Sequence, residues 1–156
     1  RAGIAQAMLN NPKILILDEP TAGLDPNERI RFRNLISELS EDRLVLLSTH
    51  IVSDIEYIAN EILLMKDGKL MHKGTADEII NSMTETVWEC FVEKNMVSDF
   101  MKKYKISNMK SEADGVILRI ISHEKPFVNA QSVEASLEDV FLYYFGEKAG
   151  DENAAI

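Results

Sequence analysis

Two adjacent carboxylates, Asp18 and Glu19, come directly after the short apolar run of residues 14–17. A carboxylate at the end of a buried parallel strand points into the crevice where α/β proteins bind ligands. Nucleotide hydrolysis needs Mg²⁺, which usually takes one or two carboxylates and often binds through water. It also needs a group that orients the attacking water. Asp18 suits the metal and Glu19 suits the water, although the bare pattern fits a solvated acidic turn equally well.

A histidine, His50, follows the second apolar run, residues 43–49. Neighbouring parallel strands end at the same edge of a sheet, so we expect His50 to lie beside Asp18 and Glu19. A histidine in that place can donate a hydrogen bond to a terminal phosphate oxygen. Taken alone, His50 fits an ordinary surface histidine at a strand end better.

The loop between these two segments carries Gly23 and Asp25 in the stretch AGLD. Asp25 is the predicted N-cap of a helix, with Pro26 at its first position and Glu28 placed to close a capping box. The plain interpretation is a glycine turn that leads into a capped helix.

The elements that must position these residues follow from apolar spacing. Residues 13–18 and 43–49 are predicted strands, each buried on both faces as in a parallel sheet. Helices are predicted before the first strand, from Pro26 onward, and after His50, and the alternation indicates a parallel α/β layer. Residues 61–75 then predict a hairpin with its turn at Asp67-Gly68. Thr75 and Glu78 predict a capped helix that runs to about residue 83.

The pattern changes near residue 84. Residues 86–92 and 115–122 favour strands, and residues 97–106 favour a helix between them. A further helix is predicted from the N-cap Ser136, with Asp139 at its third position and Gly146 as a C′ stop. These patterns divide the chain into residues 1–83, residues 84–146 as a small α+β extension, and residues 147–156 as a flexible tail.

Composition narrows the functional classes. The 156 residues carry a net charge of −9, and acidic residues outnumber basic ones before and after residue 84. That balance argues against nucleic acid as a partner, because nucleic-acid binding depends on neutralising phosphates. No apolar run approaches the ~18 residues that a membrane-spanning helix needs. The one cysteine, Cys90, excludes an intrachain disulfide and is more typical of a small buried apolar residue than of a nucleophile.

Taken together, ILILDEP, AGLD and LLSTH resemble the Walker B strand, the D-loop and the switch-histidine strand of ATP-binding cassette (ABC) ATPases, in the family's order and spacing. The resemblance implies the C-terminal half of a P-loop ATPase domain followed by a small extension, with ATP and Mg²⁺ as cofactors. It implies that Asp18 holds Mg²⁺ mainly through water, that Glu19 polarises the hydrolytic water, and that His50 contacts the γ-phosphate. Gly23 and Asp25 would lie in the D-loop, where Asp25 meets a second cassette.

The stretch SLEDVFLYYFGE, residues 136–147, resembles the C-terminal extension of cassettes that drive export-type permeases such as drug, sodium and lantibiotic exporters. This resemblance implies a membrane permease and a second ATPase subunit, identical or different, as partners. It also implies a cytoplasmic location, peripheral on the inner face of the cell membrane. It does not specify the transported substrate.

A phosphate loop of the form G-x-x-x-x-G-K-[ST] does not occur in these 156 residues. We expect the family's phosphate, glutamine and signature loops to lie upstream of position 1, so that the chain is a fragment that hydrolyses ATP negligibly by itself. Two alternatives stay open. One is an ABC ATPase of translation or DNA repair, and the other is a non-catalytic truncated module in which residues 84–146 mediate interactions.

Overall fold

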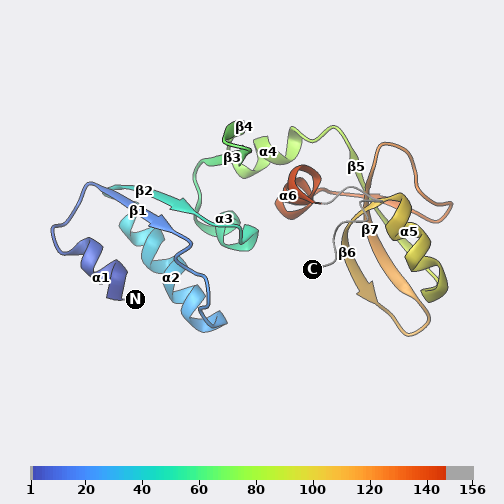
Figure 1. Cartoon of the computed structure of the whole chain (residues 1–156), viewed down its shortest axis with the longest axis horizontal. Helices are drawn as coiled ribbons and strands as arrows, with labels where there is room; N and C mark the ends of the chain where they lie inside the picture. Colours follow the sequence, from blue (N-terminus) through green and yellow to red (C-terminus); the bar gives the residue numbers. More distant parts are fainter. Residues whose placement is uncertain (1, 147–156) are drawn as a thin grey trace. The chain divides into compact units, whose positions relative to one another are not determined.

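The structure is a computed structural model that describes residues 2–146, and the predicted tail at 147–156 lies outside the described residues. Its contacts divide the chain into two compact units, Arg1–Asn60 and Glu61–Ile156 (Figure 1). The predicted boundary after residue 83, between the ATPase part and the C-terminal extension, is a different division of the chain and remains a prediction. The predicted mixed α/β class is confirmed.

In its described residues, the first unit contains two parallel strands and three helices. The elements are α1 (Ala2–Met8), β1 (Ile14–Asp18), α2 (Pro26–Leu39), β2 (Leu44–Ser48) and α3 (Val52–Ile58). Ile14 pairs with Leu44 and Asp18 with Ser48, so the two strands end level with each other. This confirms the predicted parallel layer of alternating strands and helices.

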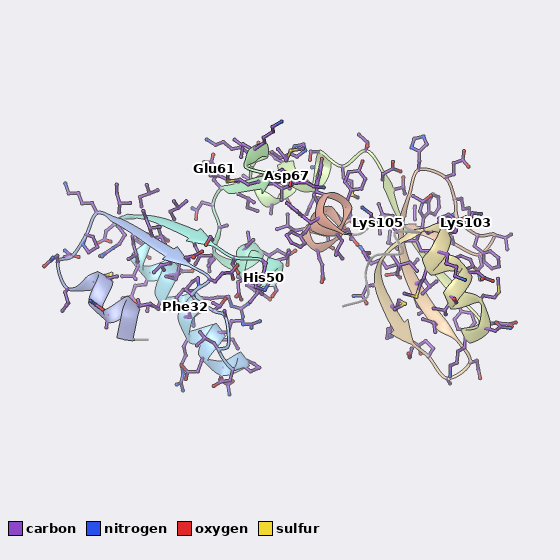
Figure 2. The ribbon with its side chains drawn as sticks, viewed as in Figure 1. Phe32, His50, Glu61, Asp67, Lys103 and Lys105 are labelled. Carbon is purple, nitrogen blue, oxygen red and sulfur yellow. The ribbon has the colours of Figure 1, made fainter. Side chains whose placement is uncertain are left out.

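The core of this unit lies on one face of the two strands. Leu15 and Leu17 of β1 pack against Phe32 and Ile36 of α2, and all four are buried. Phe32 is labelled on α2 in Figure 2. On the opposite face Ile16 is 69% exposed. The prediction that both strands are buried on both faces is therefore wrong within the described residues, because the helices α1 and α2 pack on the same face.

The start of α2 has the predicted Asp25 N-cap, whereas the Glu28 side chain, predicted to close a capping box, accepts from Arg31 at 3.0 Å. The Asp25 side chain accepts a hydrogen bond of 2.9 Å from the backbone nitrogen of Glu28, and Pro26 occupies the first turn. An aspartate cap satisfies a helix N–H that would otherwise lack a partner. This fixes the loop between β1 and α2 at its far end.

The second unit begins with a hairpin and a short helix. β3 (Ile62–Lys66) pairs with β4 (Lys69–Gly74) in antiparallel fashion. The turn residues Asp67 and Gly68 have φ values of 51° and 72°, which confirms the predicted positive-φ turn. α4 (Ala76–Asn81) begins at a complete capping box between Thr75 and Glu78, as predicted.

A four-stranded antiparallel sheet follows, in the order β6-β7-β5-β8. The strands are β5 (Thr86–Val92), β6 (Lys105–Ser111), β7 (Val116–Ser122) and β8 (Gln131–Val133). The short helix η1 (Lys94–Met96) leads into α5 (Val97–Lys103), whose Phe100 packs into the core with Cys90 and Leu118. The predicted helix at 97–106 is too long, because Lys105 and Ile106 already pair with β7.

The last helix, α6 (Leu137–Phe145), is held by a buried ion pair. Asp139 closes the predicted capping box with Ser136, and Nη2 of Arg119 on β7 donates to Oδ2 of Asp139 at 2.8 Å. Arg119 also donates to Glu89 on β5. Burial alone would raise the pKa of the Asp139 carboxyl, but hydrogen bonds from Arg119, Ser107 and Ser136 outweigh that and lower it.

The C-terminal end of α6 contacts the hairpin. The Tyr144 hydroxyl lies 2.5 Å from Nε2 of His72, and Nζ of Lys66 donates to the Tyr144 carbonyl at 2.5 Å. These contacts explain why the hairpin belongs to the second unit. α6 stops at Gly146 as predicted, but Gly146 has an extended φ of −64° rather than a left-handed one. A side chain there would come within 2.4 Å of the Leu142 carbonyl oxygen, and this close approach favours glycine.

Candidate functional site

The predicted acidic residues lie at the end of β1, beside the end of β2. Asp18 is opposite Ser48, and the Ser48 hydroxyl donates a short hydrogen bond to Oδ1 of Asp18. Asp18 is otherwise exposed. His50 lies just beyond β2, where the chain turns into α3 (Figure 2). The level ends of the two strands are what bring these residues to one edge.

Glu19 has an unusual backbone. Its φ is 43°, in the left-handed region that non-glycine residues seldom adopt. The conformation is held from both sides, since the Glu19 nitrogen donates to the Ser48 carbonyl at 2.9 Å and the Glu19 carbonyl accepts from Ala22 at 3.1 Å. Such residues persist where the surroundings determine them, and they cluster at functional sites.

Glu19 and His50 are in direct contact. Oε1 of Glu19 accepts a hydrogen bond of 3.1 Å from the His50 backbone nitrogen and lies 2.9 Å from Nδ1 of the imidazole. The expected proximity of the two residues is therefore present. A carboxylate facing Nδ1 favours a proton on that nitrogen, so Nε2 accepts in the neutral ring and donates only in the ring protonated on both nitrogens.

The second oxygen of Glu19 is available. Oε2 is buried and has no hydrogen-bond partner among residues 2–146, although the Glu19 side chain as a whole is 38% exposed. A buried carboxylate oxygen without a partner is costly, so it requires a donor such as a bound water. Thr21, whose buried hydroxyl also has no partner in the described part of the chain, lies two residues further on. Thr21 is not predicted from the sequence, where only its position next to the acidic pair points to it.

The loop residues Gly23 and Asp25 lie farther along the chain and are both exposed. Gly23 has a φ of 74°, which a side chain would oppose. Asp25 uses its carboxylate to cap α2, and no hydrogen bond within residues 2–146 connects it to Asp18, Glu19 or His50. The structure thus gathers Asp18, Glu19 and His50 and leaves the loop residues outside this group.

The donors present suit magnesium better than a metal held by protein alone. No cluster of three or more His, Cys, Asp or Glu side chains that could hold a metal occurs among residues 2–146. Mg²⁺ typically keeps several waters and takes one or two carboxylates plus substrate phosphates. Asp18 offers an exposed carboxylate with one oxygen positioned by Ser48, and this arrangement fits that mode of binding.

Sequence comparison with known proteins identifies the family of this chain. No protein-family model matches the chain. The ABC transporter ATP-binding protein YhcH of Bacillus subtilis is 30% identical over 162 residues, which cover 94% of this chain. The bacitracin transport ATP-binding protein BcrA of Bacillus licheniformis is 33% identical over 163 residues, again 94% of this chain. The chain belongs to the family of ABC transporter ATP-binding proteins.

The relatives within this family are named for different transport roles. The methionine import ATP-binding protein MetN 2 of Oceanobacillus iheyensis is 32% identical over 123 residues, or 77% of this chain. The chain spans about half the length of its relatives YhcH and BcrA, 52% and 53%, and 35% of MetN 2. Within residues 2–146, no helix of this ABC protein has the length and apolar character needed to cross a membrane.

Proposed function

We propose that the chain is part of the ATP-binding and ATP-hydrolysing subunit of an export-type ABC transporter. The observation that carries this proposal is the contact between Glu19 and His50 at the shared edge of β1 and β2, beside Asp18. An acidic residue, a histidine and a second carboxylate at this edge suit phosphoryl chemistry, in which catalysis is mostly positioning and electrostatic stabilisation.

Each residue has a distinct proposed task. Oε2 of Glu19 has no hydrogen-bond partner among the residues that the structure describes, and it is the atom that would accept a hydrogen bond from the attacking water. Nδ1 of His50 faces Glu19, so Nε2 would be the atom that donates to a γ-phosphate oxygen, with the ring protonated on both nitrogens. Asp18 would hold Mg²⁺ through water, and the ion would neutralise charge on the phosphate oxygens.

The exposed loop of Gly23 and Asp25 supports a contact with a second ATPase subunit. Gly23 provides the left-handed turn, and Asp25 fixes the start of α2. We propose that this loop carries the interface between two cassettes, whose closure on ATP would move a permease between its states.

The proposal of transport rests on the names of the relatives, which include bacitracin transport and methionine import. Export is the finer part of the proposal. It rests on the resemblance of residues 136–147 to exporter extensions, and the matches to YhcH and BcrA run through nearly the whole chain. A permease partner and a position on the inner face of the cell membrane follow from the same proposal.

The test begins with the coding sequence on both sides of the Arg1 codon. An in-frame phosphate loop would supply the protein for an ATPase assay, whereas an unrelated domain there would contradict the ATPase proposal. In the assay, Glu19→Gln should lower kcat roughly 100-fold or more with little change in KM, because a positioned base contributes about 10²–10⁴. Glu38→Gln, an exposed glutamate on α2, is the matched control. Equal activity of the two variants would also contradict the proposed role.

The 156-residue chain by itself is proposed to turn over ATP negligibly. It has no phosphate loop to supply the backbone N–H groups and the lysine that hold the β- and γ-phosphates. A steady rate of phosphate release that disappears in Glu19→Gln would refute this part of the proposal.

A further inference from the structure

A carboxylate is buried between α2 and α3, away from the residues assigned so far. The Asp54 residue, on the first turn of α3, is 1% exposed. Neither of its carboxylate oxygens has a hydrogen-bond partner within residues 2–146. A buried charge of this kind is costly unless other charges compensate for it.

Two arginines of α2 supply that compensation. Nε of Arg29 lies 3.9 Å from Oδ2 of Asp54, and Nη1 of Arg33 lies 3.7 Å from Oδ1. Arg33 is further fixed, since its Nη1 donates to the Ser53 carbonyl at 3.4 Å and its guanidinium lies 4.3 Å from the centre of the Tyr57 ring. The three charged groups form a set that we name the α2–α3 ion triad, Asp54 with Arg29 and Arg33.

The triad connects the start of α2, next to Asp25, with α3, the helix that follows His50. Arg29 is on the first turn of α2, whose N-cap is Asp25. The Arg29 backbone nitrogen donates to the Asp25 carbonyl at 3.0 Å. Asp54 is four residues after His50, on the helix that the His50 segment enters. A shift of α3 along α2 would leave the Asp54 charge unpaired in a buried place, so the triad restricts where α3, and with it His50, can lie.

We propose that Asp54 is a positioning residue that, through Arg29 and Arg33, holds His50 against Glu19 and links His50 to the loop of Asp25. The inference rests on the proposed function only for the role of His50 in hydrolysis. The positional part concerns this chain alone and can be tested without nucleotide. Apolar side chains could join two helices equally well, but a shift of an apolar contact does not leave a buried charge without its partners.

The test uses the 156-residue chain and hydrogen exchange followed by NMR. The His50 amide donates to Glu19, so its exchange rate reports whether His50 is in place. In Asp54→Asn we expect that amide to exchange about tenfold faster, the effect of losing a typical hydrogen bond. The amides of the β1–β2 ladder should keep their rates. A variant with a general loss of stability would instead speed exchange at the ladder and at His50 alike.

A second variant covers the case in which Asp54→Asn does not fold. The triple substitution Asp54→Leu, Arg29→Met and Arg33→Met removes every charge of the triad and retains apolar volume, a change that buried ion sets often tolerate. It should show the same selective loss at His50. Arg31→Met is the matched control, because Arg31 is on the same helix and pairs with Glu28 rather than Asp54.

Unchanged protection of the His50 amide in a folded Asp54→Asn or triple variant would overturn the inference, as would equal acceleration at His50 and in the ladder. These outcomes are separate from the fate of the proposed function. A selective loss at His50 supports the positioning role even if the longer protein fails to hydrolyse ATP. If Glu19→Gln lowers the ATPase rate as proposed but the His50 amide keeps its exchange rate in Asp54→Asn, only the positioning role of Asp54 is rejected.

Discussion

Oε1 of Glu19 accepts the backbone nitrogen of His50 at 3.1 Å as well as lying 2.9 Å from its ring nitrogen Nδ1. The backbone contact does not need the imidazole, so removing the ring leaves the carboxylate partly held. The ATPase assay needs a longer protein that contains both these residues and a phosphate loop. In that protein His50→Ala should lower kcat about 100-fold or more, because the variant loses a positioned hydrogen-bond donor to the charge that develops on the phosphate.

The free energy of unfolding should hardly change in the same variant. The His50 side chain is 71% exposed, and exposed substitutions usually stay within about 0.5 kcal/mol. His123→Ala, also exposed and in the second unit, should change neither property. A His50→Ala protein with full activity would remove the histidine from the mechanism.

The two faces of β1 provide a paired stability prediction. Leu15 is 2% exposed and Ile16 is 69% exposed, so Leu15→Ala should cost about 2–5 kcal/mol and Ile16→Ala clearly less. Urea unfolding followed by circular dichroism measures both. Similar losses for the two variants would mean that the exposed face of β1 is covered in solution.

The exposed face also predicts association. Its members are apolar and spread over both strands: Ile14, Ile16, Leu44 and Leu46. Contiguous apolar surface and unpaired strand edges favour self-association. In sedimentation velocity, a variant with Ile16→Lys and Leu46→Lys should associate less than the unmodified chain. Lys substitutions at the already polar exposed sites Ser37 and Asn34 of α2 serve as the comparison and should leave association unchanged.

The Arg119–Asp139 pair predicts acid sensitivity of the second unit. The folded pKa of Asp139 is lowered, so its contribution to stability is complete above the ordinary aspartate pKa of about 3.9 and is lost as the pH falls below it. Asp139→Asn should cost about 3 kcal/mol at neutral pH, the low end for breaking a buried pair, because Arg119 loses Asp139 but keeps Glu89. The loss relative to the unmodified chain should shrink in acid.

Trp88, the one tryptophan, is on β5 and reports this unfolding by fluorescence. Glu138→Gln changes the neighbouring exposed carboxylate and should leave the acid transition in place. A pH dependence that is identical in Asp139→Asn and in the unmodified chain would show that other groups control it.

Cys90 should be unreactive in the folded chain. It is 2% exposed, and burial raises the pKa of its thiol, so both access and thiolate are reduced. A thiol reagent such as dithionitrobenzoate should react slowly at neutral pH and rapidly in denaturant. Fast labelling of native protein would contradict the buried position.

Much of the fold follows from local sequence signals. The capping residues Asp25, Thr75 and Ser136 and the Asp67-Gly68 turn were predictable because each satisfies a backbone group within a few residues. The start of β6 was not, since Lys105 and Ile106 continue the helical pattern of the preceding residues and only pairing with β7 makes them part of a strand. The one-sided burial of β1 also depends on how many elements surround the sheet, which an apolar run does not encode.

The candidate site was predictable in its members and less so in its geometry. Parallel pairing and the order of the motifs place Asp18, Glu19 and His50 at one edge. The left-handed backbone of Glu19 has no local signal, because glutamate does not favour that region. The burial of Asp54 was equally hidden, since an aspartate four residues after His50 looks like a solvated helix position until α2 is in place.

Glu19 and His50 are 31 residues apart in the chain. The segment between them must form a closed loop before the two side chains meet. β1 and the capped start of α2 can form from nearby residues, but neither brings the two side chains together. Closing a loop of this length costs entropy and slows folding relative to local contacts. A growing chain, or one in which β2 has separated from β1, therefore lacks this pair altogether, and the chemistry proposed for the pair requires the complete crossover.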